Sequence, residues 1–417
     1  MKEVTKIKDT FFASCPVGIE EVLELELKDK GIKKTTKFKG GVQFECYPQF
    51  ALNFILHTKL ASRVYKTLFH FVIKNEDDLY YRCKEIKWKS VFNLDQTFKV
   101  QTLQGNSPNN QKRSKFKSSI FLSQKFKDGI VDNFRETTNK RPDVDTVSPN
   151  ASLLLRVTPQ DNEFSQKEDV SVLIDLCGEA LSKRGYKVRG FKAPLRENLA
   201  SAIVALTQHK EDQDFLDLMS GSGTLVIEAA LRKGNIPGAY LQILDHFEFG
   251  DELGFSFTTL NVYTKDEKLQ KDFKNFLDEA HKSIDKGLAA LKASKSKIIA
   301  NDIDRYTKTT LLDNIESAKL EDIIEVHTED ATDFSTQINN GIIIANPPYG
   351  ERLGIDDDLE SLYHDLGENL KQNFKGNTAY IFTGNLPLIK KISLQTSKKI
   401  ILFNGNIESR LVEYKLF

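Results

Sequence analysis

The 417-residue chain has few cysteines and no long apolar run, and both absences limit what it can be. Its four cysteines, Cys15, Cys46, Cys83 and Cys177, form no CxxC pair, which excludes a zinc ribbon and argues against a disulfide scaffold. No apolar stretch approaches the roughly 20 residues that span a membrane, and the start, MKEVTKIKDTFFASC, lacks the apolar core of a signal peptide. We therefore expect a soluble, cytoplasmic protein without membrane contact.

The chain also lacks net charge, because 59 Lys and Arg balance 59 Asp and Glu. The balance hides a polarity: residues 1–195 hold 34 basic and 24 acidic residues, whereas residues 196–417 hold 25 and 35. A basic half joined to an acidic half indicates a polyanion-binding module attached to a second module. Chance polarisation of solvated surfaces is the alternative, because net charge carries no information about fold.

The composition is that of a globular protein, since 40% hydrophobic residues support packed cores and 417 residues favour two or three domains. Residues 10–60 predict a small α+β unit, with a strand in TFFASCP, a helix in GIEEVLELELKDKGI and an alternating strand in KFKGGVQFEC. Residues 75–175 predict a second unit, in which the strands ASLLLRVTPQ and DVSVLIDLC pair after an amphipathic helix that Pro142 ends.

Basic residues concentrate in two segments of the first half, near residues 112–127 and 183–192. Non-specific nucleic-acid affinity is mostly phosphate neutralisation, so these side chains are candidates for phosphate contacts. The alternative is a solvated face of lysines, with the interleaved Phe116, Phe121 and Phe126 in the core. The candidate RNA-binding residues are Lys112, Arg113, Lys115, Lys117, Lys125, Lys183, Arg184, Lys187 and Arg189.

From about residue 196 the pattern changes to strands that alternate with helices. FLDLM, KIIAND, IIEVHTED, GIIIAN, TAYIFTG and KIILFN predict strands, and helical periodicity separates most of them. Repeated strand–helix units are typical of a doubly wound α/β sheet, in which ligands bind at the carboxyl ends of the strands.

The first candidate site motif is DLMSGSGT, which lies between a predicted strand and a helix. Its glycines allow a tight turn and close approach to a ligand, although it is neither a lysine-containing phosphate loop nor a full GxGxxG. A plain strand–helix turn is an equal alternative. The candidate residues here are Asp217, Ser220, Gly221, Ser222, Gly223 and Thr224.

Two acidic motifs follow later strands. Asp302 comes after KIIAN and is suited to accept hydrogen bonds from ribose hydroxyls, with a helix N-cap as the alternative. It lies much farther than the usual roughly 20 residues beyond the glycines, which predicts a helical insertion within residues 232–297. Asp330 follows IIEVHTE and can accept from an adenine amino group, although a turn or cap is an equal alternative.

A fourth motif, Asn346-Pro347-Pro348-Tyr349, follows the apolar strand GIIIA. Two prolines stiffen the loop and fix the direction of the carbonyls before them. Asn346 offers a side-chain carbonyl and Pro347 a backbone carbonyl, and two acceptors held close together can bind both hydrogens of a planar amino group. Tyr349 supplies a face for stacking on a base. An ordinary Asn-Pro turn is the alternative.

These motifs together resemble the class I S-adenosylmethionine-dependent methyltransferases that act on amino groups. FFASCPVGIEEVLELEL, FKGGVQFE, IDLCGEALSKRGYK, APLRENLA, LMSGSGTLVIEAA and NPPYGERLG occur in the order found in THUMP-domain guanine-N2 RNA methyltransferases. The chain is similar to the guanine-N2 half of the bacterial large-subunit ribosomal RNA enzymes, which are fused to a second methyltransferase. It departs from them at Ser220, where they usually have Cys, and at Leu218, where Pro is common.

The resemblance implies a domain order, a cofactor and a partner. The segments would be a ferredoxin-like α+β segment (residues 1–66), a THUMP RNA-binding domain (67–176), a linker (177–195) and a Rossmann-like methyltransferase domain (196–417). The cofactor would be S-adenosylmethionine, and the partner structured RNA of the 23S type or a ribosome assembly intermediate. No metal is expected, because no His, Cys and carboxylate cluster has ligand spacing.

The resemblance also assigns roles to the motif residues. Asp217 and the glycine loop that follows it would line the methionine end of the cofactor, Asp302 would hold the ribose and Asp330 would meet the adenine. Asn198, in PLRENLA, would help to close this site, and Asn346 would border it.

The NPPY motif would hold a guanosine that has left its stack, at a cost of a few kcal/mol. Asn346 and the Pro347 carbonyl would bind the exocyclic amine, Pro348 would stiffen the loop, and Tyr349 would stack on the base. Transfer would then be an in-line displacement promoted by positioning, without a strong general base.

Other functions stay open at this point. NPPY also occurs in DNA adenine-N6 methyltransferases and in enzymes that methylate glutamine in proteins, because the chemistry of a planar amine is shared. The basic first half favours structured RNA. A transfer-RNA guanosine-N2 enzyme with the same domains, and a non-catalytic RNA-binding protein of ribosome assembly, are the further alternatives.

Overall fold

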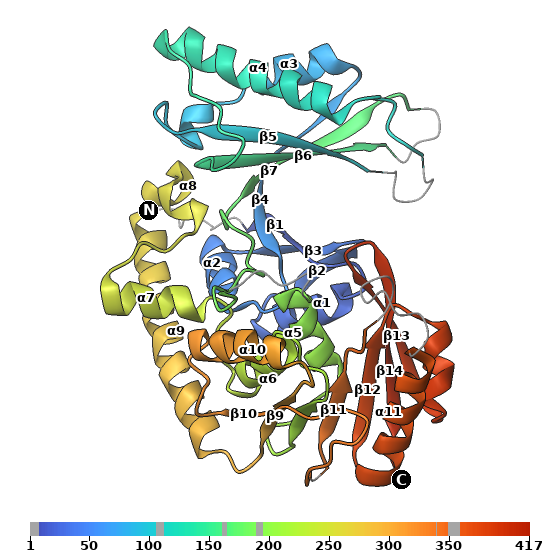
Figure 1. Cartoon of the computed structure of the whole chain (residues 1–417). Helices are drawn as coiled ribbons and strands as arrows, with labels where there is room; N and C mark the ends of the chain where they lie inside the picture. The colour runs from blue at the N-terminus through green and yellow to red at the C-terminus, as the bar shows by residue number, and fades with distance from the viewer. Residues whose placement is uncertain (1–7, 106–111, 161–164, 189–194, 339, 349–358) are drawn as a thin grey trace.

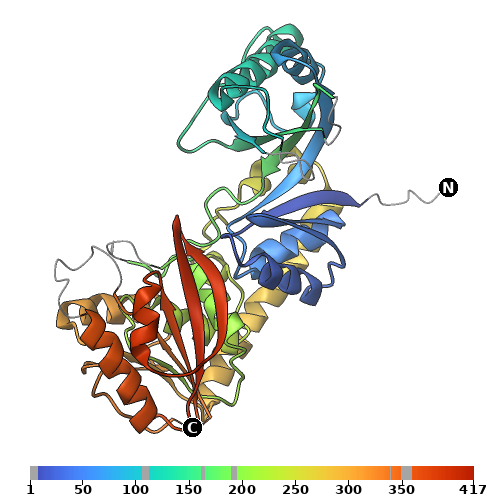
Figure 2. The ribbon, with the colours of Figure 1, turned by 90° about the vertical axis from the view of Figure 1, so that its right-hand side faces the viewer.

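The fold is described from a computed structural model of the chain, which places residues 8–105, 112–160, 165–188, 195–338, 340–348 and 359–417. These residues form two seven-stranded sheets. Figures 1 and 2 show the first sheet extending from the top of the molecule to its middle, and the second sheet in the lower part.

The first sheet has the strand order β2-β3-β1-β4-β7-β6-β5. Its strand β4 pairs with β1 through residues 63–66 and with β7 through residues 65–73. The boundary predicted between residues 66 and 67 thus falls inside β4, and the two segments share one hydrogen-bonded sheet. The strands are β1 (Asp9–Ser14), β2 (Lys34–Phe38), β3 (Gly41–Cys46), β4 (Arg63–Ile73), β5 (Phe98–Gln104), β6 (Ala151–Pro159) and β7 (Glu168–Asp175).

The helices of this part follow the predicted amphipathic segments, and the predicted pairing of β6 with β7 is confirmed. The longest helix, α4, begins where the Ser118 hydroxyl accepts a hydrogen bond from Phe121 N–H and ends at Asn139, which is left-handed. Phe116 and Phe126 are buried as core residues, whereas Phe121 is 44% exposed. The helices are α1 (Glu20–Asp29), α2 (Pro48–His57), α3 (Glu76–Lys84), η1 (Trp88–Ser90) and α4 (Ser119–Thr138).

The second sheet has the order β10-β9-β8-β11-β12-β14-β13. The first five strands in this order, from β10 to β12, are parallel to one another. Strand β14 lies between β12 and β13 and runs antiparallel to both. The chain order reverses between β8 and β11, which is the point where ligands bind in doubly wound sheets. The strands are β8 (Phe215–Asp217), β9 (Ile298–Asn301), β10 (Ile324–His327), β11 (Ile342–Ala345), β12 (Thr378–Thr383), β13 (Thr396–Asn404) and β14 (Ile407–Lys415).

Both faces of the second sheet are covered, as the apolar strands predict. Phe215 and Ile298 pack into the larger core on one face, and their neighbours Leu216 and Ile299 pack into a second core on the other face. The predicted doubly wound α/β sheet is confirmed. The larger core includes residues of α5 (Glu197–Leu206), α6 (Thr224–Lys233) and α10 (Arg305–Ser317). The second core includes residues of α11 (Leu359–Asn373) and η3 (Pro387–Ile392).

The predicted helical insertion between the glycine loop and Asp302 is also confirmed. Its longest helix, α9, runs beside the second sheet, and α8 lies next to the upper part of the molecule (Figure 1). The insertion consists of α7 (Tyr240–Phe249), η2 (Ser256–Thr259), α8 (Asn261–Thr264) and α9 (Glu267–Ala293).

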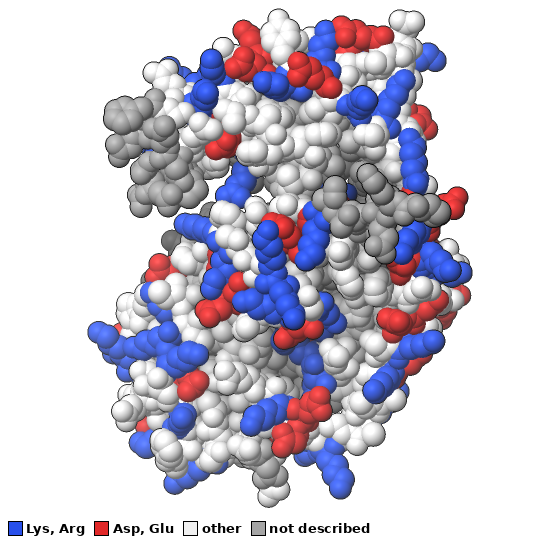
Figure 3. Space-filling view, turned by 180° about the vertical axis from the view of Figure 1, so that it is seen from behind, with Lys and Arg blue, Asp and Glu red and all other residues white. Residues whose placement is uncertain are grey.

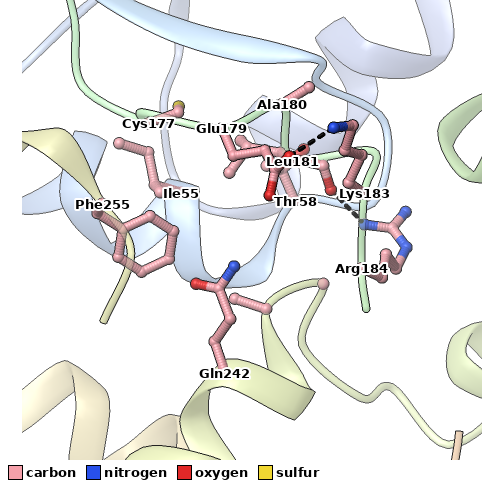
Figure 4. A pocket seen from close by; sticks show the side chains of 12 residues that line it. Ile55, Thr58, Cys177, Glu179, Ala180, Leu181, Lys183, Arg184, Gln242 and Phe255 are labelled. Atoms are coloured by element: carbon pink, nitrogen blue, oxygen red, sulfur yellow. Dashed lines mark hydrogen bonds and ion pairs between the residues drawn. The ribbon is translucent and has the colours of Figure 1, made fainter. Parts of the chain in front are cut away.

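Arg184 was expected to bind RNA, and this expectation is wrong. Its side chain is fully buried, where Nε donates to Glu228 Oε1 (2.7 Å) and Nη2 to Glu228 Oε2 (3.2 Å) and to the carbonyl of Lys59 (2.6 Å). Burial disfavours the charged guanidinium, but the Glu228 carboxylate outweighs it and raises the pKa of Arg184. Figure 4 shows Arg184 beside Lys183 at a cavity of about 10 Å³, where the lower part of the molecule meets the first sheet. Arg184 therefore joins the two parts.

Lys187, another candidate RNA-binding residue, also has partners within the chain. Its side chain is only 17% exposed, and Nζ donates to the Leu195 carbonyl (2.7 Å) and pairs with Glu197 (3.5 Å). Burial lowers the pKa of Lys187 despite this carboxylate. The ammonium group is thus engaged at the start of α5, and a contact of Lys187 with RNA stays a prediction.

Two further properties concern the whole described chain. Within the ranges given above, no helix is both long and apolar enough to cross a membrane. All four cysteines are buried free thiols.

Replacing the buried guanidinium should destabilise the protein strongly. We expect Arg184→Met to lower the free energy of unfolding by about 3–5 kcal/mol, because Glu228 is left buried without its partner. The neighbouring Lys183 pairs with Glu179 at the surface with a side chain 67% exposed, so Lys183→Met should change stability by less than about 0.5 kcal/mol. Urea-induced unfolding measures both. Equal effects of the two substitutions on stability would contradict the structural role of the buried Arg184–Glu228 pair. Adding Glu228→Leu to Arg184→Met should restore much of the lost stability, because no unpaired charge then stays buried.

Candidate functional site

Asp217 ends β8, the first strand of the second sheet. The residue is fully buried, and its Oδ1 accepts from the Met219 N–H (3.2 Å), whereas Oδ2 has no hydrogen-bond partner among the described residues. Burial raises the pKa of this carboxyl to about 8, and the hydrogen bond from Met219 only partly opposes it. A buried carboxylate oxygen without a partner is a polar group that a ligand can satisfy.

Asn346 follows β11, the strand that pairs with β8. The register places Ile344 opposite Asp217, and the Leu218 N–H donates to the Ile344 carbonyl (2.8 Å), so the two strand ends stay together. Asn346 Oδ1 is likewise buried without a described partner. Because paired strands lie about 4.8 Å apart, two unpartnered oxygens occupy one edge of the sheet.

The glycine loop connects Asp217 to α6. Gly221 and Gly223 have φ of 52° and 81°, and Gly223 N–H donates to the Ser220 carbonyl (2.8 Å), which closes the turn. Ser220 Oγ donates to the Asp217 carbonyl (3.1 Å), and Ser222 Oγ lies 3.2 Å from Thr224 Oγ1. Serine at position 220 is therefore hydrogen-bonded within the turn.

Asp302 lies in contact with this loop. Its Oδ2 accepts from the Gly221 N–H (2.7 Å) and Oδ1 from the Asp304 N–H (3.0 Å), and burial raises the pKa of its carboxyl. The alternative role of helix N-cap belongs instead to Asp304, whose Oδ1 accepts from Tyr306 N–H (2.8 Å). Asp302 thus lies at the same edge as Asp217.

Asp330 lies at the end of the neighbouring strand β10 and is exposed. Its Oδ1 accepts from both the N–H (2.9 Å) and the hydroxyl (2.7 Å) of Thr332. The turn considered as its alternative role is therefore present, and a contact with adenine stays a prediction.

Asn198 is fully buried in α5 and faces the first sheet. Its Nδ2 donates to the Leu60 carbonyl (3.3 Å) and to Ser62 Oγ (2.9 Å), whereas its Oδ1 has no partner among the described residues. The amide thus helps to join the two parts of the molecule. Its role in closing the cofactor site stays a prediction.

Two asparagines that the sequence analysis gave no role organise the site. Asn301 is fully buried, and its Nδ2 donates to the carbonyls of Leu218 (3.1 Å) and Glu329 (3.0 Å) while Oδ1 accepts from Glu329 N–H (3.0 Å). It ties the ends of β8, β9 and β10 together. An asparagine directly after an apolar strand was the signal that could have found it.

Asn314 supports the glycine loop from α10. Its Nδ2 donates to the Ser222 carbonyl (2.8 Å), and its Oδ1 accepts from Val188 N–H (3.1 Å). The residue is fully buried on the apolar face of its helix, together with Leu311 and Ile315. A polar residue at helical spacing within an apolar face was the available signal.

The NPPY motif is only partly described. Pro347 is buried and Pro348 is half-buried, directly beyond Asn346. Tyr349 lies outside the described residues, as does Arg189 of the candidate RNA-binding set.

The remaining basic candidates lie on or near the surface of the first half. Lys112 Nζ donates to the Ser165 carbonyl (2.6 Å), Lys115 Nζ contacts the carbonyls of Lys74 and Gln166, and Lys125 pairs with Asp77 (3.1 Å). Lys183 is exposed with its partner Glu179, and Arg113 and Lys117 are exposed. Figure 3 shows basic and acidic side chains interspersed on the face opposite to that of Figure 1. RNA contacts by these residues stay predictions.

No group of three or more His, Cys, Asp or Glu suited to holding a metal ion occurs in the part of the chain that the structure describes.

The chain matches three family models along its length. Residues 10–65 match an RlmL ferredoxin-like domain, residues 73–161 a THUMP domain, and residues 184–413 an RMKL-like methyltransferase domain. The match over residues 184–413 covers more than half of the chain and contains the site at Asp217, Asp302 and Asn346.

Similar proteins agree with these matches. The ribosomal RNA large subunit methyltransferase K/L of Desulfotalea psychrophila is 32% identical over 98% of this chain and 53% of its own length. A possible methylase from Clostridium difficile 630 has a TM-score of 0.79 at 26% identity, with 98% of each chain covered. SMU.472, solved in complex with SAH, has a TM-score of 0.76 at 24% identity over 99% of each chain, a likeness that shows the fold. The chain spans about half the length of the curated relatives it matches.

The fold and the strand-end site define a Rossmann-like methyltransferase domain that follows ferredoxin-like and THUMP domains. The chain belongs to the family described as RMKL-like, methyltransferase domain.

The buried carboxyl of Asp217 should make the ligand-free protein less stable as pH rises. Below about pH 4, folded and unfolded chains both keep this proton. Between that pH and about 8 the unfolded chain releases it and the folded chain retains it, so the free energy of unfolding falls. The amide in Asp217→Asn cannot titrate. At pH 9 the free energy of unfolding of this variant should therefore exceed that of the wild type by roughly 1–3 kcal/mol, whereas at pH 4 it should not. Chemical unfolding at several pH values across this range measures the effect. If the free energy of unfolding depended on pH equally in the two proteins, Asp217 would not be its source.

Proposed function

We propose that this chain transfers a methyl group from S-adenosylmethionine to the exocyclic N2 amine of a guanosine in large-subunit ribosomal RNA. The observation that carries the proposal is a pair of buried oxygens, Asp217 Oδ2 and Asn346 Oδ1, at the reversal point of the second sheet, which have no hydrogen-bond partner among the described residues. Leaving such groups unpaired costs roughly 1–3 kcal/mol each, so they favour ligands that donate hydrogen bonds. A cofactor ammonium and a planar amine are two such donors.

The residues at the strand ends fit the cofactor. The Asp217 carboxylate suits the cationic amino group of its methionine part, and the Asp302 carboxylate suits its ribose hydroxyls. A Cβ atom at Gly221 would meet no atom within 4 Å, so the glycine loop leaves open space on that side. When bound there, S-adenosylmethionine supplies an electrophilic methyl group.

The NPPY residues fit a planar amine. Asn346 Oδ1 and the Pro347 carbonyl would each accept one N–H of the target amine, which turns its lone pair out of the ring and toward the methyl group. With the cofactor bound, the N–C bond would form as the S–C bond breaks, and the extra proton of the amine would leave to solvent. Positioning supplies most of the acceleration in this scheme.

Two findings support RNA, and ribosomal RNA in particular, as the substrate. The THUMP-domain match covers residues 73–161, where exposed Arg113 and Lys117 lie. The curated relatives are named ribosomal RNA large subunit methyltransferase K/L. Guanosine N2 is the amine that the family resemblance implies.

Cofactor affinity should increase with pH. Burial keeps Asp217 protonated below about pH 8, so an ammonium must displace that proton when it binds. Between pH 6 and 7.5 we expect the affinity for S-adenosylmethionine to rise by up to about tenfold per unit, before the ligand's own amino group titrates near 8. Isothermal titration calorimetry measures this and the released proton. Asp217→Asn should bind weakly and independently of pH, and a wild-type affinity that did not change with pH would exclude the ammonium contact.

Methyl transfer should depend on Asn346. We expect the purified protein to form N2-methylguanosine in protein-free large-subunit rRNA, detected by nuclease digestion and mass spectrometry. Asn346→Ala should slow this on the order of 10²–10³-fold while cofactor binding persists, because a preorganised hydrogen-bond acceptor is lost. Gln372→Ala is the control, since Gln372 is exposed at the end of α11 that precedes β12.

The product identifies the substrate among the alternatives. N2-methylguanosine only in tRNA would move the substrate to tRNA, and N6-methyladenine in DNA would overturn both base and substrate. Binding of RNA without methylation of any nucleic acid would support the non-catalytic alternative.

A further inference from the structure

The insertion between α6 and β9 contacts all three domains of the chain. We propose that its residues 254–264 form a latch on the THUMP domain, and that α9 holds this latch at a set distance from the Asp217–Asn346 edge. The insertion would thereby be a specificity-determining element that selects which nucleotide of a bound RNA reaches the site. The inference rests on the proposed function for its substrate, but its structural part does not.

The lower half of α9 is packed tightly on the methyltransferase domain. A Cβ atom at Gly287 would lie 2.4 Å from the Gly234 carbonyl oxygen, and one at Gly234 would lie 2.8 Å from Leu291. Gly234 ends α6, the helix that begins at the glycine loop. The base of α9 is therefore connected to the cofactor side of the domain through a single helix.

The upper half of α9 continues along the ferredoxin-like domain. Its Phe276 ring lies 6.4 Å from that of Phe50 on α2. The helix has 27 residues, and at 1.5 Å per residue it is about 40 Å long. Figures 1 and 2 show it extending from the second sheet toward the upper part of the molecule.

The latch itself centres on Asn261, which is 4% exposed. Its Nδ2 donates to the Lys89 carbonyl (2.9 Å) and to Asn93 Oδ1 (2.9 Å), and its N–H donates to the Val91 carbonyl (2.9 Å). From the other side, Gln96 Nε2 donates to the Thr259 carbonyl (2.9 Å). Four hydrogen bonds thus join four THUMP residues, all within residues 89–96, to one turn of the insertion.

A second contact holds the latch to the strand that leaves the THUMP domain. Ser256 Oγ donates to the Asp175 carbonyl (2.7 Å), and Phe257 N–H donates to the Leu176 carbonyl (3.2 Å). Gly178 has φ of 76°, and a Cβ atom there would lie 2.9 Å from the Gly254 carbonyl oxygen, so the backbones approach closely. Two separated contacts on one domain prevent it from pivoting about either.

The consequence for an RNA substrate is geometric. An RNA held by the THUMP domain can present only nucleotides that lie at the distance and direction set by α9. Misplacement of a reacting group by about 1 Å costs on the order of 10²-fold in rate, so small rotations of the THUMP domain matter. Strands β4 and β7 join the THUMP domain to the ferredoxin-like domain, and the latch adds a separate connection to the insertion. Relative rotation is the default for domains without a large apolar interface, so this added connection matters.

The test compares Asn261→Asp with Lys268→Ala. Asn261→Asp keeps the shape of the side chain but replaces Nδ2, which donates both hydrogen bonds, with an oxygen that cannot donate to the Lys89 carbonyl or to Asn93 Oδ1. Lys268 is an exposed residue of the same insertion and lies in the first turn of α9. Gln96→Ala, which removes one bond from the THUMP side, is a milder variant if Asn261→Asp folds poorly.

Domain orientation is measured first, and needs no substrate. All four native cysteines are buried, so spin labels at Tyr81→Cys, on exposed α3, and Gln372→Cys, on α11, report one interdomain distance by pulsed electron paramagnetic resonance. We expect one narrow distance distribution for the wild type and Lys268→Ala, and a broad one for Asn261→Asp. Equally narrow distributions in all three would overturn the latch.

Methylation is measured second, on protein-free large-subunit rRNA. We expect Asn261→Asp to lower kcat on the order of 10²-fold, with RNA and S-adenosylmethionine dissociation constants within about twofold of wild type, and to methylate additional guanosines. An unchanged rate and product site would overturn the selection role. If the wild type methylates no RNA, the proposed function fails, whereas the distance measurement still decides the latch.

Discussion

The parallel pairing of β8 with β9 on one side and β11 on the other is the constraint on which the site depends. Backbone hydrogen bonds set the register, so Asp217 is opposite Ile344 of one neighbour and Ala300 of the other. Parallel strands end at the same edge, and the residues that follow them must meet there. This ladder brings Asp302 and Asn346, which are far from Asp217 in the chain, to the same edge of the sheet. The glycine loop then turns within the same edge because Gly221 N–H donates to Asp302.

Two kinds of buried polar group bear on the site. Asn301, Asn314 and the Arg184–Glu228 pair are satisfied by partners in other elements, and each joins strands, helices or domains. Asp217 Oδ2 and Asn346 Oδ1 have no such partners among the described residues and lie together at the strand ends. The first kind rigidifies the structure and the second favours a ligand, because a buried polar atom is costly unless it is paired.

Sequence patterns predicted the elements well where periodicity or a motif was strong. The alternation of strands and helices after residue 196, the helical insertion and the paired β6 and β7 are all confirmed. Asp302 was identified as a candidate from its place after an apolar strand, and the structure places it in contact with the glycine loop. The helix N-cap, which was its alternative role, is Asp304. Arg184 was misread as RNA-binding, because a basic residue in a cluster looks the same in the sequence whether or not its partners bury it. The partner of Arg184 is Glu228, which lies 44 residues away.

The sequence by itself determined the doubly wound class of the second half and the residue types at the strand ends, because these depend on local periodicity and short motifs. The expected order of domains came from the family resemblance. Only the tertiary structure decided that the ferredoxin-like and THUMP segments share one sheet through β4 and β7. It alone showed that Arg184 and Asn198 join domains, and that Asn261 fastens the insertion to the THUMP domain. The reason is physical: burial and pairing depend on residues brought together from distant parts of the chain, and no local pattern records which surfaces will meet.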